Sequence, residues 1–178
     1  NREPRERVER VAPWLTVDSD PYPAVIDGRI VWILDGYTTT DRYPLAERES
    51  VDTMLDDSLT PDTTFGTLPT DEINYMRNAV KATVDAYDGS VNLYAWDESD
   101  PILEAWRNAF PGTVQDRDDI PESVMEHLRY PEDMFKVQRY QFARYHVTDA
   151  GDFYRGSDRW EVPEDPYLEG SYQPPYRL

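Results

Sequence analysis

The sequence contains no cysteine in its 178 residues. This absence excludes disulfides, thiolate metal sites and cysteine nucleophiles, but it does not decide the compartment, because many exported bacterial proteins also lack cysteine. Long apolar runs are missing too: no stretch approaches the roughly 18–20 residues that cross a bilayer, and there is no signal peptide. These absences describe this stretch of chain alone and do not bear on a longer parent.

Basic residues are scarce. There are 18 lysines and arginines against 36 aspartates and glutamates, for a net charge of −18. A chain of this sign repels nucleic acid and anionic lipid, and it lacks the basic stripe that a nucleic-acid-binding protein needs. We therefore expect no nucleic-acid partner.

Histidine is the rarest of the usual catalytic residues, with two in the chain, His127 and His146. Neither stands in an HExxH or HxH spacing, so no metal-ligand pattern supports them. Each falls in or at the end of a predicted helix. We expect both to have structural roles, in packing or in satisfying a helix terminus.

Glycine is sparse as well, with eight residues against fifteen prolines, which favours stiff, extended connections. Aromatic residues are plentiful at 13%, and this share indicates a core built from large rings. The length is that of one domain. Because the sequence begins at Asn1 rather than Met and ends in a Pro/Tyr-rich segment, we expect residues 1–178 to be one soluble domain excised from a longer polypeptide.

A hairpin is predicted at Asp88-Gly89, because this pair separates two alternating runs. A two-residue loop there places Val84 opposite Leu93 and gives the hairpin one apolar and one mixed face. The apolar face is expected to comprise Ala82, Val84, Ala86, Val91, Leu93 and Ala95.

A second hairpin is predicted at Asp27-Gly28. In its register Val25 lies opposite Ile30, while Ala24 lies opposite Val31, so both faces are apolar. This hairpin is therefore expected to be the more buried of the two.

Helices are predicted around the hairpins. Residues 2–15 carry apolar side chains at helical spacing, and Asp100-Pro101, Pro121 and Pro131 each begin a later helix. The Pro121 helix has a capping-box pattern, and the Pro131 helix is expected to turn an aromatic face inward. The residues concerned are Ser123 and Glu126 for the box, and Phe135, Gln138, Phe142 and Tyr145 for the face. Together with Trp106 and Phe110, the rings of Phe135 and Phe142 are expected to dock on the apolar face of the Asp88-Gly89 hairpin.

The remaining segments show no sustained periodicity of apolar residues. Within Thr38–Pro69, residues 45–70 are expected to form a long, partly mobile loop, and residues 160–178 an extended tail. The predicted fold class is α+β: an antiparallel sheet built from two Asp-Gly hairpins, with helices packed on one side.

Asp18, Ser19 and Asp20, with Asp27 nearby, could supply oxygen ligands for Ca²⁺ or Mg²⁺. The EF-hand spacing and its glycine are missing, and Asp and Ser before Pro-Tyr-Pro more often form turns. Paired carboxylates can be imagined anywhere among 36 acids, so they carry no signal by themselves. No metal ligand is therefore assigned.

Asp35–Pro44 is the segment in which a site should be sought first. It combines hydroxyls, acids, an arginine and two tyrosines directly after an apolar strand, where binding residues often lie. The same residue types also satisfy bare backbone groups at a strand exit. No GxSxG elbow, P-loop or GxGxxG occurs, so no catalytic or cofactor-binding residue is assigned and no cofactor is expected.

Four segments of the chain closely resemble an uncharacterised bacterial family. They are APWLTVDSDPYPAVIDGRIVWILDGYTTTDRYP (12–44), NYMRNAVKATVDAYDGSVNLYAWDESDPILEAW (74–106), HLRYPEDMFKVQRYQFARYHV (127–147) and FYRGSDRWEVPEDP (153–166). The family is uncharacterised protein family 0182, found notably in actinobacteria. The resemblance implies a large multi-spanning membrane protein, of which this chain is part of a long soluble region outside the cytoplasm. It offers no catalytic residue or substrate to transfer.

We therefore hypothesise a non-catalytic extracytoplasmic module of an integral protein of the cell membrane, serving interaction, assembly or ligand presentation at the envelope. Its partners would be the remainder of the parent protein and other envelope proteins or polymers. One alternative is a metal-dependent enzyme or binder acting on envelope polymers through Asp18, Asp20 or Asp35. Another is a solute-binding accessory domain of a transporter, with a pocket lined by Tyr and Trp.

Overall fold

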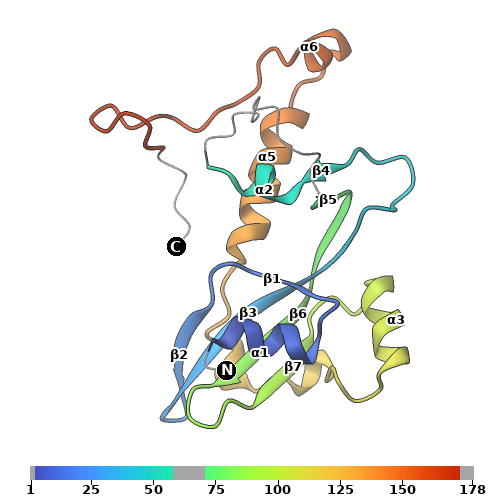
Figure 1. Ribbon diagram of the computed structural model, residues 1–178, viewed down its shortest axis with the longest axis vertical. Helices are drawn as coiled ribbons and strands as arrows, with labels where there is room; N and C mark the ends of the chain where they lie inside the picture. The colour runs from blue at the N-terminus through green and yellow to red at the C-terminus, as the bar shows by residue number, and fades with distance from the viewer. Residues whose placement is uncertain (1–2, 58–70, 173–178) are drawn as a thin grey trace. The chain divides into compact units, whose positions relative to one another are not determined.

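The computed structural model describes residues 3–57 and 71–172, and they fall into two compact units (Figure 1). The first unit comprises residues up to 46 and residues 74–134, and the second comprises residues 47–73 and those from 135 onward. The α+β class predicted from the sequence is confirmed. The last residues of the predicted loop (58–70) and of the predicted tail (173–178) lie outside the described residues.

The first unit is built on a five-stranded antiparallel sheet, in which the two longest strands lie at the centre (Figure 1). The order is β1-β3-β6-β7, and β2 also pairs with β3. The strands are β1 (Thr16–Val17), β2 (Tyr22–Ile26), β3 (Arg29–Thr40), β6 (Tyr75–Asp85) and β7 (Val91–Ala95).

The hairpin of β2 and β3 has the two-residue turn that its Asp-Gly pair predicts. Ile26 pairs with Arg29, and Asp27 and Gly28 have φ angles of 50° and 77°, as a type I′ turn requires. The expectation that this hairpin is the more buried is wrong, because Val25 is 67% exposed. One face of β2 packs in a core through Tyr22, Ala24 and Ile26, whereas Pro23 and Val25 on its other face are exposed.

The hairpin of β6 and β7 has a wider turn than predicted. Val84 pairs with Val91, two residues away from the predicted partner Leu93. The carboxylate of Asp85 accepts the backbone N–H groups of Tyr87 (2.7 Å) and Asp88 (3.2 Å), and this local side-chain turn replaces the two-residue loop. Because the slip is by an even number of residues, each side chain of the two strands keeps its predicted face.

One face of the sheet packs against helices α1 (Pro4–Val11) and α3 (Pro101–Ala109). In Figure 1, α1 lies across β6 and β7. Asp100 caps α3 by accepting the N–H of Leu103 at 3.1 Å, and Pro101 occupies the first turn, as predicted. The core of this face combines small strand residues with helix residues: Val8, Ala12, Leu34, Val80, Ala82, Val84, Leu93, Ala95 and Leu103.

The rings predicted to dock on this face are not part of its buried core. Phe110 is 53% exposed, and Trp106 stacks between Trp14 and Phe110, with centroid distances of 5.4 Å and 5.7 Å. The apolar side chains of α1 take the space instead, because Val8 is fully buried against the strands.

The other face of the sheet is covered too, which corrects the prediction that helices pack on one side. A second cluster joins Ile33 and Tyr94 to Ile120 and Val124, which belong to the segment holding the short helices η1 (Arg117–Asp119) and α4 (Glu122–Met125). The predicted capping box at Ser123 is also wrong. Its hydroxyl donates to Asp27 at 3.2 Å, and a capping box forms instead at Asp116 and Asp119.

In its described residues the second unit holds a two-stranded sheet, β4 (Glu49–Ser50) with β5 (Glu72–Ile73), and the helices α2 (Val51–Leu55), α5 (Glu132–Tyr145) and α6 (Ala150–Arg155). The division between the units falls near the start of α5. The predicted loop 45–70 therefore contains regular structure in β4 and α2. The predicted tail is tied by a backbone bond from Trp160 to Ala143 (3.1 Å) and by a bridge between Glu164 and Tyr172.

Helix α5 turns a different face inward from the one predicted. Val137, Tyr140 and Ala143 are buried, whereas Phe142 and Tyr145 are 62% and 54% exposed. The exposed rings contact other rings instead: Phe142 lies edge-on to Trp160 at 5.4 Å, and Tyr145 lies 5.1 Å from Phe153. Among the described residues, no helix has both the length and the apolar character needed to cross a bilayer.

Candidate functional site

The acids that the sequence singles out lie inside the first unit. Asp18 and Asp35 are 2% and 3% exposed, and both belong to a buried polar network beside the second half of β3. Buried carboxylates need hydrogen-bond partners, and here the chain itself supplies them.

Asp18 is surrounded by donors. Its carboxylate accepts the hydroxyl of Tyr37, the N–H of Asp133 at 3.1 Å and the N–H of Asp20 at 2.8 Å. Asp133 in turn accepts the N–H and hydroxyl of Ser19, at 2.8 Å and 2.7 Å. This exchange links the segment after β1 to Asp133, which also belongs to the first unit. Asp20 contributes its backbone here, and in the described ranges 3–57 and 71–172 no three acidic or histidine side chains converge as metal ligands would.

Asp35 forms a buried ion pair with Lys81, its cross-strand partner on β6, and accepts a hydrogen bond from Asn78 at 2.7 Å. The Lys81 ammonium also lies 5.2 Å from the centroid of Trp96. Burial raises the pKa of Asp35, and the charge of Lys81 opposes this rise without cancelling it. Burial also raises the pKa of Tyr37, with a further contribution from Asp18, so Tyr37 keeps its proton and acts as a donor.

Most of the Asp35–Pro44 segment belongs to strand β3 and does not follow it, because β3 continues to Thr40. Its hydroxyls point to internal partners: Thr38 is fully buried and donates to Asp100 at 2.6 Å. Beyond the strand, Tyr43 stacks on Tyr75 at 5.7 Å and donates its N–H to Asn74 at 2.9 Å. Thr38 and Tyr43 therefore make internal contacts that hold this segment in place.

The two histidines belong to different units, His127 to the first and His146 to the second. In each, Nδ1 lies near the carbonyl oxygen four residues earlier, at 2.8 Å for His127 and 3.1 Å for His146. His146 also stacks on Trp160, with 4.1 Å between centroids.

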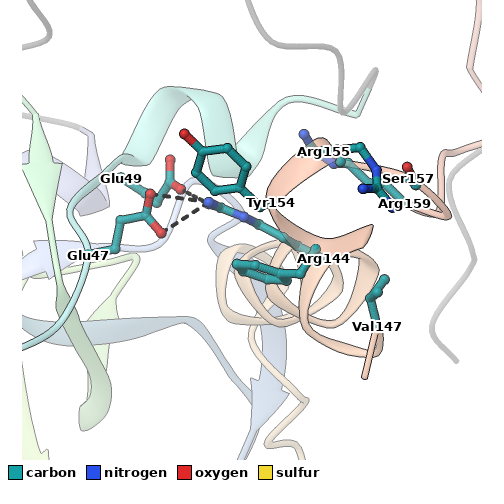
Figure 2. A pocket seen from close by; sticks show the side chains of 10 residues that line it. Glu47, Glu49, Arg144, Val147, Tyr154, Arg155, Ser157 and Arg159 are labelled. Atoms are coloured by element: carbon teal, nitrogen blue, oxygen red, sulfur yellow. Dashed lines mark hydrogen bonds and ion pairs between the residues drawn. The ribbon is translucent and has the colours of Figure 1, made fainter. Parts of the chain in front are cut away.

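An open pocket of about 390 Å³ lies in the second unit (Figure 2). Most of its wall comes from the end of α5, from α6 and from the turn that follows. The lining residues are Glu47, Glu49, Arg144, Val147, Phe153, Tyr154, Arg155, Gly156, Ser157 and Arg159. A pocket of this volume is within the range of small-molecule sites.

Local sequence chemistry shapes this wall. Asp149 caps α6 by accepting the N–H of Asp152 at 2.9 Å, and Gly156 ends the helix in the left-handed region, with φ of 67°. Asp158 also has a positive φ, of 63°. Two left-handed residues so close together reverse the chain, so that Arg155 and Arg159 both line the pocket.

The three arginines of the pocket differ in their partners. Arg144 is paired with Glu49 and, at 3.1 Å, with Glu47, as the dashed lines of Figure 2 show. Arg155 is paired with Asp152 at 2.5 Å through one of its terminal nitrogens. Among the described residues, Arg159 has no carboxylate partner. Its Nε is buried and has no hydrogen-bond partner in the part of the chain that the structure describes, and its guanidinium lies 5.1 Å from the centroid of Tyr140.

The sequence reasoning missed this site. The run FYRGSDRW served there only as part of a family resemblance, although it carries a usable signal: two arginines flank a Gly-Ser-Asp turn. A turn of that kind brings flanking side chains together. The partner acids Glu47 and Glu49 lie almost 100 residues away in sequence, and no local pattern joins them to Arg144.

A second pocket, of about 330 Å³, lies in the first unit beside the β6–β7 turn, and Trp32, Val84 and Tyr87 contribute to its wall. Its one arginine, Arg7, donates to the carbonyl of Gly89 at 2.9 Å. Its other charged groups, Asp85 and Asp88, are paired with Arg29. This pocket offers a ligand fewer unused polar groups than the arginine-lined one.

Comparison with known proteins places the chain in a family without an assigned activity. All 178 residues match the model of "Uncharacterised protein family (UPF0182)". The chain is 74% identical over its full length to a UPF0182 protein of Nocardioides sp., and 55% identical over 181 aligned residues to UPF0182 protein SCO5204 of Streptomyces coelicolor. A UPF0182 protein of Thermobifida fusca is 54% identical over 179 residues, covering 99% of the chain.

The chain spans 18% of the length of each of these curated relatives. No solved structure is detectably similar to it. On the strength of the match over its whole length, the chain belongs to the uncharacterised protein family UPF0182.

Proposed function

We propose that this chain is a non-catalytic binding module of a larger membrane protein, displayed outside the cytoplasm, and that its binding surface is the arginine-lined pocket of the second unit. One observation carries the proposal. Asp18, Asp35 and Tyr37 are buried and hydrogen-bonded within the first unit, whereas the open pocket is lined by three arginines and two aromatic rings, and its two acids are paired with Arg144.

The pocket favours binding over catalysis because it lacks a nucleophile with a positioned base. Glu47 and Glu49 are held by Arg144, and Ser157 has no histidine or carboxylate within hydrogen-bond reach among the described residues. Arginine and tyrosine, in contrast, are the residue types that dominate recognition sites.

The membrane setting is supported by the size of the relatives and by the family resemblance. A chain that spans 18% of each relative leaves most of the parent for other parts. The interaction partners we propose are the remainder of that parent and envelope proteins or polymers.

The experiment that tests the setting uses the absence of cysteine. In the full-length parent, freed of any cysteine elsewhere, Tyr167→Cys places a thiol at a side chain that is 92% exposed. We expect intact cells to be labelled at this position by a membrane-impermeant maleimide. Ala79→Cys is the control, because Ala79 is fully buried and should be labelled only after denaturation.

Labelling of Tyr167→Cys only after lysis would contradict the extracytoplasmic placement. Turnover of an envelope polymer by the purified chain, lost in Glu49→Gln, would contradict the non-catalytic role. These outcomes separate the proposal from an enzyme acting on envelope polymers.

A further inference from the structure

We propose that the Arg155–Arg159 end of the pocket binds a phosphoryl group carried by a small ligand. This inference names the ligand class of the pocket and rests on the proposed binding role. Three independent features support it: an unused buried donor, an incompletely used arginine and the division of charge within the pocket.

The first feature is the buried Nε of Arg159. Within residues 3–57 and 71–172 it has no hydrogen-bond acceptor, although a buried polar group without a partner costs of the order of 1–3 kcal/mol. The chain has twice as many acids as bases, yet none of the described acids is placed to accept from this arginine. An oxygen of a bound oxyanion would supply the missing acceptor.

The second feature is the neighbouring donors. Arg155 uses one terminal nitrogen on Asp152 and is 66% exposed, so the rest of its guanidinium is accessible from the pocket. Ser157 lies between the two arginines in sequence and lines the same wall, and Figure 2 shows the three side chains grouped together. Two guanidinium groups and a hydroxyl supply more donors than a carboxylate can accept from, and a phosphoryl group offers three oxygens to them.

The third feature is the position of the acids. Glu47 and Glu49 lie at the Arg144 end of the pocket and are bound to that arginine, so they would repel an anion there. The phosphoryl group is therefore assigned to the Arg155–Arg159 end. Tyr154, which is 92% exposed, lines the same pocket, with its ring beside Glu49 and Arg144 in Figure 2, and can contact the body of the ligand.

A free ligand and a lipid headgroup share this chemistry. The net charge of −18 disfavours approach to an anionic bilayer, so we assign the site to a soluble phosphorylated molecule.

The test is a titration of the purified chain with inorganic phosphate in a buffer free of other oxyanions, followed through the side-chain Nε–Hε resonances of the arginines. We expect a saturable shift of the Arg159 resonance. Arg155→Gln should weaken binding about tenfold, since it removes a charged hydrogen bond at an exposed side chain. Arg10→Gln is the matched control, with the same charge change on an exposed residue of α1, and should leave the affinity within about twofold.

Arg159→Gln should abolish saturation. Because this side chain also packs on Tyr140, its variant is checked for an unchanged thermal melt, and Ser157→Ala provides a second variant at an exposed position. A shift that is linear in phosphate, or equal losses in Arg155→Gln and Arg10→Gln, would overturn the site. Co-sedimentation with phosphatidylglycerol vesicles that depends on Arg159 would identify a lipid headgroup as the source of the phosphoryl group.

Failure of the phosphate titration would leave the maleimide result untouched, because that experiment reports placement rather than ligand. The two proposals can therefore fail separately.

Discussion

At the scale of single residues, the first unit contains charged side chains that are buried and paired with each other. Asp35 and Lys81 are 3% and 2% exposed and neutralise each other across two central strands. A buried ion pair contributes little net stability when it is complete, but removing one partner leaves a buried charge without compensation.

Lys81→Met should therefore destabilise the chain by about 3–5 kcal/mol, as measured by urea denaturation. The double variant Lys81→Met, Asp35→Asn should recover much of this loss, because it also removes the unpaired carboxylate of Asp35. Arg42→Met removes a cation whose side chain is 88% exposed and should change stability by no more than about 0.5 kcal/mol. A loss below about 1 kcal/mol in the single variant would mean that the site rearranges to admit water.

Asp85 gives the chain a defined response to acid. A hydrogen bond from Arg29 and the N–H groups of the turn, opposed by some desolvation, hold the pKa of Asp85 at about 2, against an ordinary value of 3.8. The pKa of Asp85 is lower in the folded than in the unfolded chain. Its contribution to stability is therefore fully present above pH 3.8 and is lost as the pH falls through about 2.

The melting temperatures of the native chain and of Asp85→Asn should therefore differ most at neutral pH and converge as the pH approaches 2. In an Arg29→Gln background the same comparison should show a smaller dependence on pH, since the largest cause of the shift has been removed. A difference that stays constant down to pH 2 would exclude this linkage.

At the scale of elements, β6 is the strand on which the first unit depends. It pairs with β3 and β7, and its Val84 is 2% exposed within the core shared with α1. β2 offers a contrast, because Val25 on that strand is 67% exposed.

Val84→Asp should abolish the cooperative thermal transition seen by circular dichroism, because it places an unpaired carboxylate in an apolar core. Val25→Asp makes the same chemical change at an exposed position and should melt as the native chain does. A retained cooperative melt in Val84→Asp would show that this face is not the core.

The sequence predicted elements well where a local signal decides them. The Asp27-Gly28 turn, the proline at the start of α3 and the Asp100 cap all depend on neighbouring residues, and all three occur as expected. The two-residue turn predicted at Asp88-Gly89 does not form, because the carboxylate of Asp85, three residues before the pair, accepts backbone N–H groups of a wider turn. The inward face of α5 was misassigned because ring-bearing residues such as Phe142 pack against Trp160, not in the core.

At the scale of the whole chain, the division into two units was out of reach of pattern reasoning. The second unit brings residues 47–73 together with those from 135 onward, and periodicity carries no information about partners so distant in sequence. The candidate pocket depends on that pairing, since Glu49 and Arg144 form an ion pair although they lie 95 residues apart in sequence. The buried network could not be predicted for the same reason, because the hydrogen bond between Asp133 and Asp18 joins residues 115 positions apart in sequence.

The stack of Trp14 on Trp106 equips the molecule with an intrinsic optical reporter. The two indoles lie 5.4 Å apart with their planes 10° from parallel, close enough for their electronic transitions to couple. Trp14 follows α1 and Trp106 belongs to α3, so a change in the near-ultraviolet dichroism of this pair would register the separation of one segment from the other without any added label.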